Sequence, residues 1–224
     1  MGEDIDMREI VLPGDPQDPG LKPGDWTYEE DGVVYATRVG VKSIRSGHVN
    51  ITPLEGRYIP KVGDRVIGTV MEAMPSSWLV DINSPYPALL HVNEVEKKVE
   101  FGNTASFLDT GDSALMIISS VDEVRKVQAT MKGEGLRKIT GGQVIEVRPT
   151  RVPRIVGKKG SMIKMLNEMT HCRIFIGQNG RIWADGEDGD IARATLTIKK
   201  IEAEAHTIGL TERVKEYVKE IYDE

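Results

Sequence analysis

The first 60 residues carry apolar positions in short, alternating runs. Residues 32–39 and 48–54 show the period-two pattern and the β-branched content typical of strands, and the Ser-Gly pair at positions 46–47 marks a turn between them. Four prolines between positions 13 and 23 make the opening a loop rather than a helix. The pattern predicts a small N-terminal β domain over residues 1–60.

A second group of apolar runs lies between residues 61 and 137. Each run is short, and glycines stand at the bends between them. The expected strands are residues 62–70, 78–82, 88–92, 115–118 and 124–131. Five short strands within about 70 residues are typical of a small closed barrel such as the OB fold. This predicts a five-stranded OB barrel over residues 61–137.

The remaining residues, 138–224, combine strand and helix patterns. The expected elements are a strand over 143–147, a short helix at 154–156 that begins near Pro153, a helix over 161–170, strands over 172–176 and 181–184, and a final helix. Asp188 or Asp190 can cap the final helix, which we expect to end near His206. The predicted order is therefore βααββα, and the whole chain is expected to be a multidomain α+β protein.

The sequence Gly-Lys-Lys-Gly at residues 157–160 joins the first two helices of this region. Two glycines let a backbone approach a ligand closely, and the lysines bring positive charge to it. A helix that begins at Ser161 would add unpaired N–H groups and the positive end of its dipole. In isolation, a turn with two solvated lysines explains the four residues equally well. The order of elements resembles that of a KH domain, whose G-x-x-G loop binds about four nucleotides, and this favours an RNA-binding loop.

Charge is distributed unevenly along the chain. The net charge is −6, and the first 32 residues carry ten acidic and two basic side chains. Residues 148–164, in contrast, carry six basic and no acidic side chains. One basic patch in an acidic molecule argues against indiscriminate binding of nucleic acid and favours a local site. The RNA-binding residues predicted here are Arg151, Arg154, Gly157, Lys158, Lys159, Gly160 and Lys164.

The barrel sequence resembles the RNA-binding OB domain of the S-one class, which is named after a ribosomal protein. The matching residues are Val-Gly-Asp at 62–64, Gly-Thr-Val at 68–70, Trp78 and Leu-Leu-His-Val at 89–92. The resemblance implies that Trp78 and His91 lie on a nucleic-acid face, where bases stack on an exposed ring. A buried Trp78 and a merely hydrogen-bonded His91 are the alternatives. Arg125 and Lys126, near the last hairpin, would supply cations, because residues 61–100 hold four bases against six acids.

The order of the three domains resembles one family, the archaeal RNA-binding cap subunits of the exosome that are homologous to ribosomal RNA-processing protein four. The resemblance covers nearly the whole chain and includes Val-Leu-Pro-Gly-Asp at residues 11–15 and Gly-Gln-Asn-Gly at residues 177–180. It implies that the 177–180 turn packs domains together. It also implies three copies on a six-membered ring of ribonuclease-PH-like subunits, with the barrels around an RNA entry pore. The expected function is capture of single-stranded RNA for 3′-to-5′ degradation or processing.

Two other functions fit the same modules. A free-standing RNA chaperone or translation-associated protein would use them for RNA binding alone. A ring-assembly protein would keep them only as structural parts. The acidic, proline-rich start of the chain favours docking on a partner over free RNA binding.

No grouping of residues in the sequence indicates catalysis. The chain contains no P-loop motif and no cysteine–histidine cluster. The densest carboxylates lie between residues 185 and 190, where capping of a helix explains them better than a metal site does. Cys172 is the single cysteine, which fits a reducing cytoplasm, and no apolar run is long enough to span a bilayer. We therefore expect a cytoplasmic, non-catalytic protein without a cofactor or metal.

Overall fold

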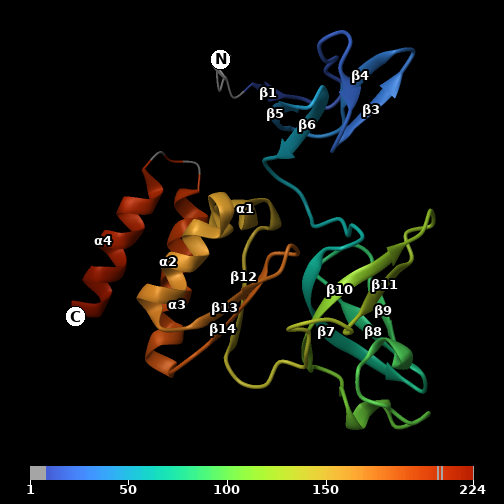
Figure 1. Ribbon diagram of the computed structural model, residues 1–224, viewed down its shortest axis with the longest axis vertical. Coiled ribbons are helices and arrows are strands. Elements are labelled where there is room, and N and C mark those ends of the chain that lie inside the picture. Colours follow the sequence, from blue (N-terminus) through green and yellow to red (C-terminus); the bar gives the residue numbers. More distant parts are fainter. Residues whose placement is uncertain (1–8, 206, 208, 224) are drawn as a thin grey trace. The chain divides into compact units, whose positions relative to one another are not determined.

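The computed structural model describes residues 9–205, 207 and 209–223 (Figure 1). The chain divides into two compact units after Gly56, called unit 1 and unit 2 below. Unit 1 is built of strands, whereas unit 2 combines strands and helices, which confirms the predicted multidomain α+β class. None of the helices in the described ranges is both long and apolar enough to cross a membrane.

Unit 1 contains two small sheets. Four strands form one sheet in the order β1-β5-β6-β2, and β3 and β4 form a hairpin. The strands are β1 (Ile10–Val11), β2 (Lys22–Pro23), β3 (Thr27–Glu30), β4 (Val33–Ala36), β5 (Gly40–Arg45) and β6 (His48–Pro53). The core residues are Val11, Ala36, Val49 and Ile51, with Leu21 and Trp26 packed against them.

The turn between β5 and β6 lies where the sequence predicts it. Ser46 and Gly47 both have positive φ angles, 50° and 78°, which a two-residue hairpin turn of type I′ requires. Before this turn the sequence predicts one strand, over residues 32–39, but the structure has two. The chain bends at residues 38–39 and pairs again from Gly40. A Cβ on Gly40 would come within 2.4 Å of a side chain of β6, so glycine permits this close crossing.

The first half of unit 2 is a closed barrel of five strands in the order β10-β11-β9-β8-β7, which confirms the predicted OB-type fold. The strands are β7 (Arg65–Met74), β8 (Ser77–Asp81), β9 (Ala88–His91), β10 (Ser113–Val121) and β11 (Val127–Thr130), with 3-10 turns at Val92–Glu94 and Thr104–Ser106. Alternate residues point inward, and the interior is filled by side chains such as Val66, Val80, Leu90, Met116 and Ala129.

The second half of unit 2 has an antiparallel sheet in the order β12-β14-β13 and four α-helices. The strands are β12 (Gln143–Glu146), β13 (Arg173–Ile176) and β14 (Arg181–Asp185). The helices are α1 (Val152–Val156), α2 (Ser161–Thr170), α3 (Asp188–Glu204) and α4 (Leu210–Asp223), with 3-10 turns at Pro149–Arg151 and Lys158–Gly160. Up to α3, this is the predicted βααββα order of a KH domain.

The start of α3 differs from the prediction. Its N-cap residue is Glu187, and the side chain of Glu187 makes no capping hydrogen bond. Asp188 and Asp190 lie in the first turn of the helix, so the predicted capping by one of them is wrong. Their negative charges still interact favourably with the positive end of the helix dipole. The helix ends at Glu204, and its predicted end near His206 lies outside the described residues.

The C-terminal helix α4 has no counterpart in the prediction. Leu210, Val214 and Val218 are buried at spacings of four residues and pack into the same core as the other helices. Arg213 Nε also donates to Glu204 Oε2 at 2.9 Å and thereby ties α4 to the end of α3. The Arg213 guanidinium, followed by the ammonium of Lys200, lowers the pKa of Glu204 below its usual range.

The KH sheet is covered on both faces. The strand register places Val144, Trp183 and Phe175 side by side, and these residues pack against Ile67 and Leu115 of the barrel. Residues of the opposite parity on the same strands pack against the helices. The barrel and the KH fold therefore share one continuous body.

Candidate nucleic-acid interface

The Gly-Lys-Lys-Gly loop, residues 157–160, connects α1 to α2. Gly157 ends α1 with φ 75°, and its N–H donates to the carbonyl of Pro153 at 3.0 Å. A Cβ at this position would lie 2.8 Å from the backbone nitrogen of Met162, so the turn requires glycine. Gly160 has φ 76° directly before α2. The two glycines thus make a tight turn with the two lysines at its tip.

Lys158 and Lys159 are exposed, and neither is paired with a carboxylate in the described part of the chain. Lys159 has φ 53°, a left-handed conformation that costs a non-glycine residue roughly 1–2 kcal/mol. The N-cap of α2 is Gly160, which offers no side-chain acceptor to the first N–H groups of the helix. A hollow of about 320 Å³ lies beside the loop and reaches the start of α4 at Leu210. Positive charge and a helix start without a side-chain cap, at one turn, suit the binding of phosphates.

The other predicted cations of this region have different surroundings. Arg154 on α1 donates from Nη2 to the carbonyl of Thr207 at 2.9 Å, so it also holds the segment between α3 and α4. Lys164 is exposed one turn into α2, 3.9 Å from the carboxylate of Glu168. Arg151 is half-buried directly before α1. The three cations therefore lie on the segments that flank the loop, and two of them already have a partner within the chain.

Trp78 does not lie on a nucleic-acid face. Its side chain is fully buried in the barrel, and its indole N–H donates to the carbonyl of Leu108 at 2.8 Å. Trp78 and Val80 point into the interior, and the outward position between them holds Leu79. The prediction that bases stack on Trp78 is wrong, because the strand turns this ring toward the core.

The other predicted barrel residues are exposed but lie apart. His91 ends β9, and its Nδ1 accepts a hydrogen bond from the N–H of Asn93 at 3.1 Å. Arg125 and Lys126 lie in the turn between β10 and β11. The residue after Lys126 pairs with Ala88, at the opposite end of β9 from His91. Three residues of strand separate these ends by roughly 10 Å, so the predicted barrel residues do not form one cluster.

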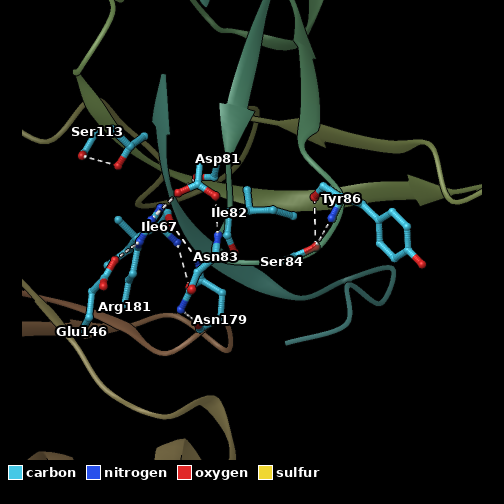
Figure 2. A network of polar contacts seen from close by, with 11 residues as sticks. Ile67, Asp81, Ile82, Asn83, Ser84, Tyr86, Ser113, Glu146, Asn179 and Arg181 are labelled. Atoms are coloured by element: carbon cyan, nitrogen blue, oxygen red, sulfur yellow. Dashed lines mark hydrogen bonds and ion pairs between the residues drawn. The ribbon is translucent and has the colours of Figure 1, made fainter. Parts of the chain in front are cut away.

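The Gly-Gln-Asn-Gly turn between β13 and β14 joins the KH fold to the barrel (Figure 2). Asn179 is fully buried, and its side chain bonds only to barrel backbone. Its Oδ1 accepts from the N–H of Ile67 at 3.3 Å, and its Nδ2 donates to the carbonyls of Ile67 at 2.8 Å and Ile82 at 3.0 Å. Asn83 returns a bond from Nδ2 to the carbonyl of Asn179 at 2.8 Å. The turn thus packs domains together, as the resemblance implies.

A buried arginine completes this junction (Figure 2). Arg181 donates from Nη1 to the carbonyl of Asp81 at 2.8 Å and pairs with the carboxylate of the same residue. Its Nε also bonds Glu146 Oε1 at 3.0 Å. In the sequence Arg181 is only part of a strand, and no local pattern indicates its partner 100 residues away.

The carboxylates near α3 belong to the start of the helix, with Asp188 and Asp190 in its first turn. No group of three or more histidines, cysteines or acids that could hold a metal occurs among the residues with described positions. Asp190 pairs with Arg193 at 3.2 Å within the helix. Cys172 is buried, and burial raises the pKa of its thiol, which disfavours the nucleophilic thiolate.

Comparisons with protein families match both halves of unit 2. Residues 57–100 match the model described as the S1 domain of RRP4, the class that the barrel sequence resembles. Residues 142–190 match the model of a KH domain. The second match contains the Gly-Lys-Lys-Gly loop and the Gly-Gln-Asn-Gly turn.

Curated relatives and a solved structure extend the similarity to nearly the whole chain. The exosome complex component Rrp4 of Methanosarcina mazei is 43% identical over 213 residues, which cover 95% of this chain and 82% of that protein. The corresponding protein of Thermoplasma volcanium is 42% identical, with 96% and 92% covered. A crystal structure described as an exosome complex RNA-binding protein has a TM-score of 0.69 and 38% identity, and the match covers 75% of this chain and 98% of that one. The chain therefore belongs to the Rrp4 family of exosome complex components.

Proposed function

We propose that this protein is a non-catalytic, RNA-binding cap subunit of the exosome. It captures single-stranded RNA and guides it into the pore of a ring of ribonuclease-PH-like subunits, which degrades or processes the RNA from 3′ to 5′. The observation that carries the proposal is the Gly-Lys-Lys-Gly loop. Two lysines without a carboxylate partner in the described chain and a helix start without a side-chain cap meet at one turn, which suits the binding of phosphates. The names of the relatives support an RNA-binding role within an exosome.

Docking on the ring is assigned to unit 1, with three copies of the chain on each ring. Its first 32 residues carry ten acids and two bases, which would repel RNA but suit a basic protein groove. Leu12 and Val39 are exposed at 55% and 40%, and a hollow of about 750 Å³ is lined by Pro13, Val39 and Leu54. The hollow also contains Arg38 and Glu55, so it offers apolar contacts together with polar partners, as docking surfaces for other proteins do.

The RNA-binding part of the proposal is tested by replacing both loop lysines with aspartate. The variant Lys158→Asp/Lys159→Asp should remain folded, because both side chains are exposed. It should bind single-stranded RNA more weakly, and the slope of log affinity against log salt should fall by roughly the value of two phosphate contacts. Fluorescence anisotropy at several salt concentrations measures both quantities.

A matched control separates the loop from net charge. Lys22→Asp/Lys219→Asp changes the total charge by the same amount at two exposed lysines outside the loop. The control should keep most of the affinity and the original salt slope. If both double variants lose the same affinity and slope, the loop is not the contact and the proposed RNA site fails.

A further inference from the structure

The barrel carries one strongly exposed aromatic ring that no predicted site includes. Phe101 is 81% exposed, more than any other aromatic side chain described in the structure; Tyr28 follows at 43%. Leaving such a ring in water is unfavourable, and exposed aromatic rings are the usual platforms on which unpaired bases stack. The exposure of Phe101 therefore suggests that the ring contacts a ligand.

The backbone around Phe101 is held firmly against the barrel. Residues 100–103 form a turn closed by a bond from the N–H of Asn103 to the carbonyl of Glu100 at 3.1 Å. Gly102 has φ 80°, as the third residue of a type II turn requires, and its N–H donates to the carbonyl of Pro75 at 2.8 Å. Thr104 adds a bond from Oγ1 to the carbonyl of Met74 at 2.7 Å. The ring thus projects from a turn that is fixed on both sides.

The same hairpin turn of β7 and β8 also holds the segment with His91. The carbonyl of Ser76 accepts the N–H of Val92 at 3.0 Å, and Ser77 pairs with His91. Pro75 and Ser76 are adjacent, so Phe101 and His91 flank one end of the barrel. This is the end opposite to the turn that contains Arg125 and Lys126.

The surroundings of Phe101 suit a nucleobase better than a protein. Its neighbours in sequence, Glu100, Gly102 and Asn103, are exposed and either polar or without a side chain. Stable protein interfaces bury a contiguous apolar centre, which this turn lacks. Lys97 and Lys98 are exposed on the preceding segment and have no carboxylate partner in the described chain. They can approach the phosphates on either side of a stacked base.

We infer that Phe101 is a base-stacking site for single-stranded RNA at the end of the barrel that also carries His91. This inference rests on the proposed RNA-binding function. The acids Glu94, Glu96 and Glu100 offset the two lysines of the segment, so the energy of this site comes mainly from stacking and little from release of counterions. The site therefore takes over the role that the buried Trp78 cannot have.

The test compares three variants of the full chain in RNA binding at several salt concentrations. Phe101→Leu keeps apolar volume but removes the ring, and we expect a fall in affinity of about 5- to 100-fold for an unstructured oligonucleotide. The salt slope should not change, in contrast to that of the loop-lysine variant. Phe101→Tyr keeps the ring and should bind like the wild type. The control is Val124→Ala. Val124 is an apolar residue, 73% exposed, in the turn between β10 and β11, and its replacement should not change the affinity for RNA.

Each outcome decides the inference. Equal affinity of Phe101→Leu and wild type overturns it, and so does an equal loss in Phe101→Tyr and Phe101→Leu. If Phe101→Leu binds RNA normally but associates more weakly with the ribonuclease-PH-like subunits, the phenyl group of Phe101 contacts protein and the inference is likewise wrong. A wild-type chain that binds no RNA defeats the proposed function as well. When the loop-lysine variant is impaired and Phe101→Leu is not, only the stacking site fails.

Discussion

Replacing Asn179 with alanine should weaken the junction between the KH fold and the barrel. The change removes three hydrogen bonds and leaves the N–H of Ile67 and the carbonyls of Ile67 and Ile82 without partners in a buried position. An unsatisfied buried group costs roughly 1–3 kcal/mol, and the lost volume adds to this cost. We expect unit 2 to lose about 3–6 kcal/mol of its free energy of unfolding, since the penalties are not fully additive.

The assay is denaturant unfolding followed by tryptophan fluorescence. Trp183 lies at the junction, where its Nε1 donates to the carbonyl of Gly141 at 3.0 Å, and Trp78 reports on the barrel core. The adjacent Gln178→Ala is a matched control, because this side chain is exposed and only its backbone N–H bonds to the carbonyl of Arg65. The control should change stability by about 0.5 kcal/mol or less.

A charged variant adds a pH test at the same position. In Asn179→Asp an ionised carboxylate would face two carbonyl oxygens, so burial and repulsion raise its pKa in the folded state above the unfolded value. The protonated form can donate to one carbonyl, and the variant should therefore be most stable at low pH and lose stability as the pH rises through the folded pKa. If Asn179→Ala is no less stable than Gln178→Ala, or Asn179→Asp shows no such dependence, the junction does not have the stated role.

Three further predictions concern catalysis, docking and the barrel core. The purified chain with Mg²⁺ or Mn²⁺ and phosphate should leave a labelled oligonucleotide intact, and cleavage that disappears in Asp188→Asn/Asp190→Asn would show that it is an enzyme. Deleting residues 1–55 should abolish association with the ring, measured by light scattering, while the remainder still binds RNA; unchanged association of a fragment shown to be folded by circular dichroism would place the docking surface elsewhere. Trp78→Leu should lower the free energy of unfolding by about 2–4 kcal/mol and leave the salt slope of RNA binding unchanged, and a changed slope in the folded variant would contradict the core position.

The sequence predicts the modules well because their signals are local. The Gly-Lys-Lys-Gly loop stands between two helical patterns, and the five barrel strands each carry their own alternation. The sequence also indicates that Trp78 points inward. Trp78, Val80 and Ile82 are alternate residues and thus lie on one face of the strand, whereas the charged Asp81 lies on the other. The same holds for α4, whose apolar residues recur at spacings of four.

The junction, in contrast, could not be derived from local patterns. Asn179 bonds to Ile67, 112 residues earlier, and no periodicity connects the two positions. Phe101 was missed for a different reason. A single phenylalanine in a loop gives no sign of its exposure until the turn that carries it is seen pinned to the β7–β8 hairpin.

The two-sided cover of the KH sheet limits how this chain can be cut or recombined. Separating the barrel from the KH fold near residue 137 would expose Val144, Phe175 and Trp183 on one fragment and Ile67 and Leu115 on the other. Both fragments would expose contiguous apolar surfaces and would tend to aggregate. An engineered protein that keeps either module alone would therefore need a new partner surface at the break.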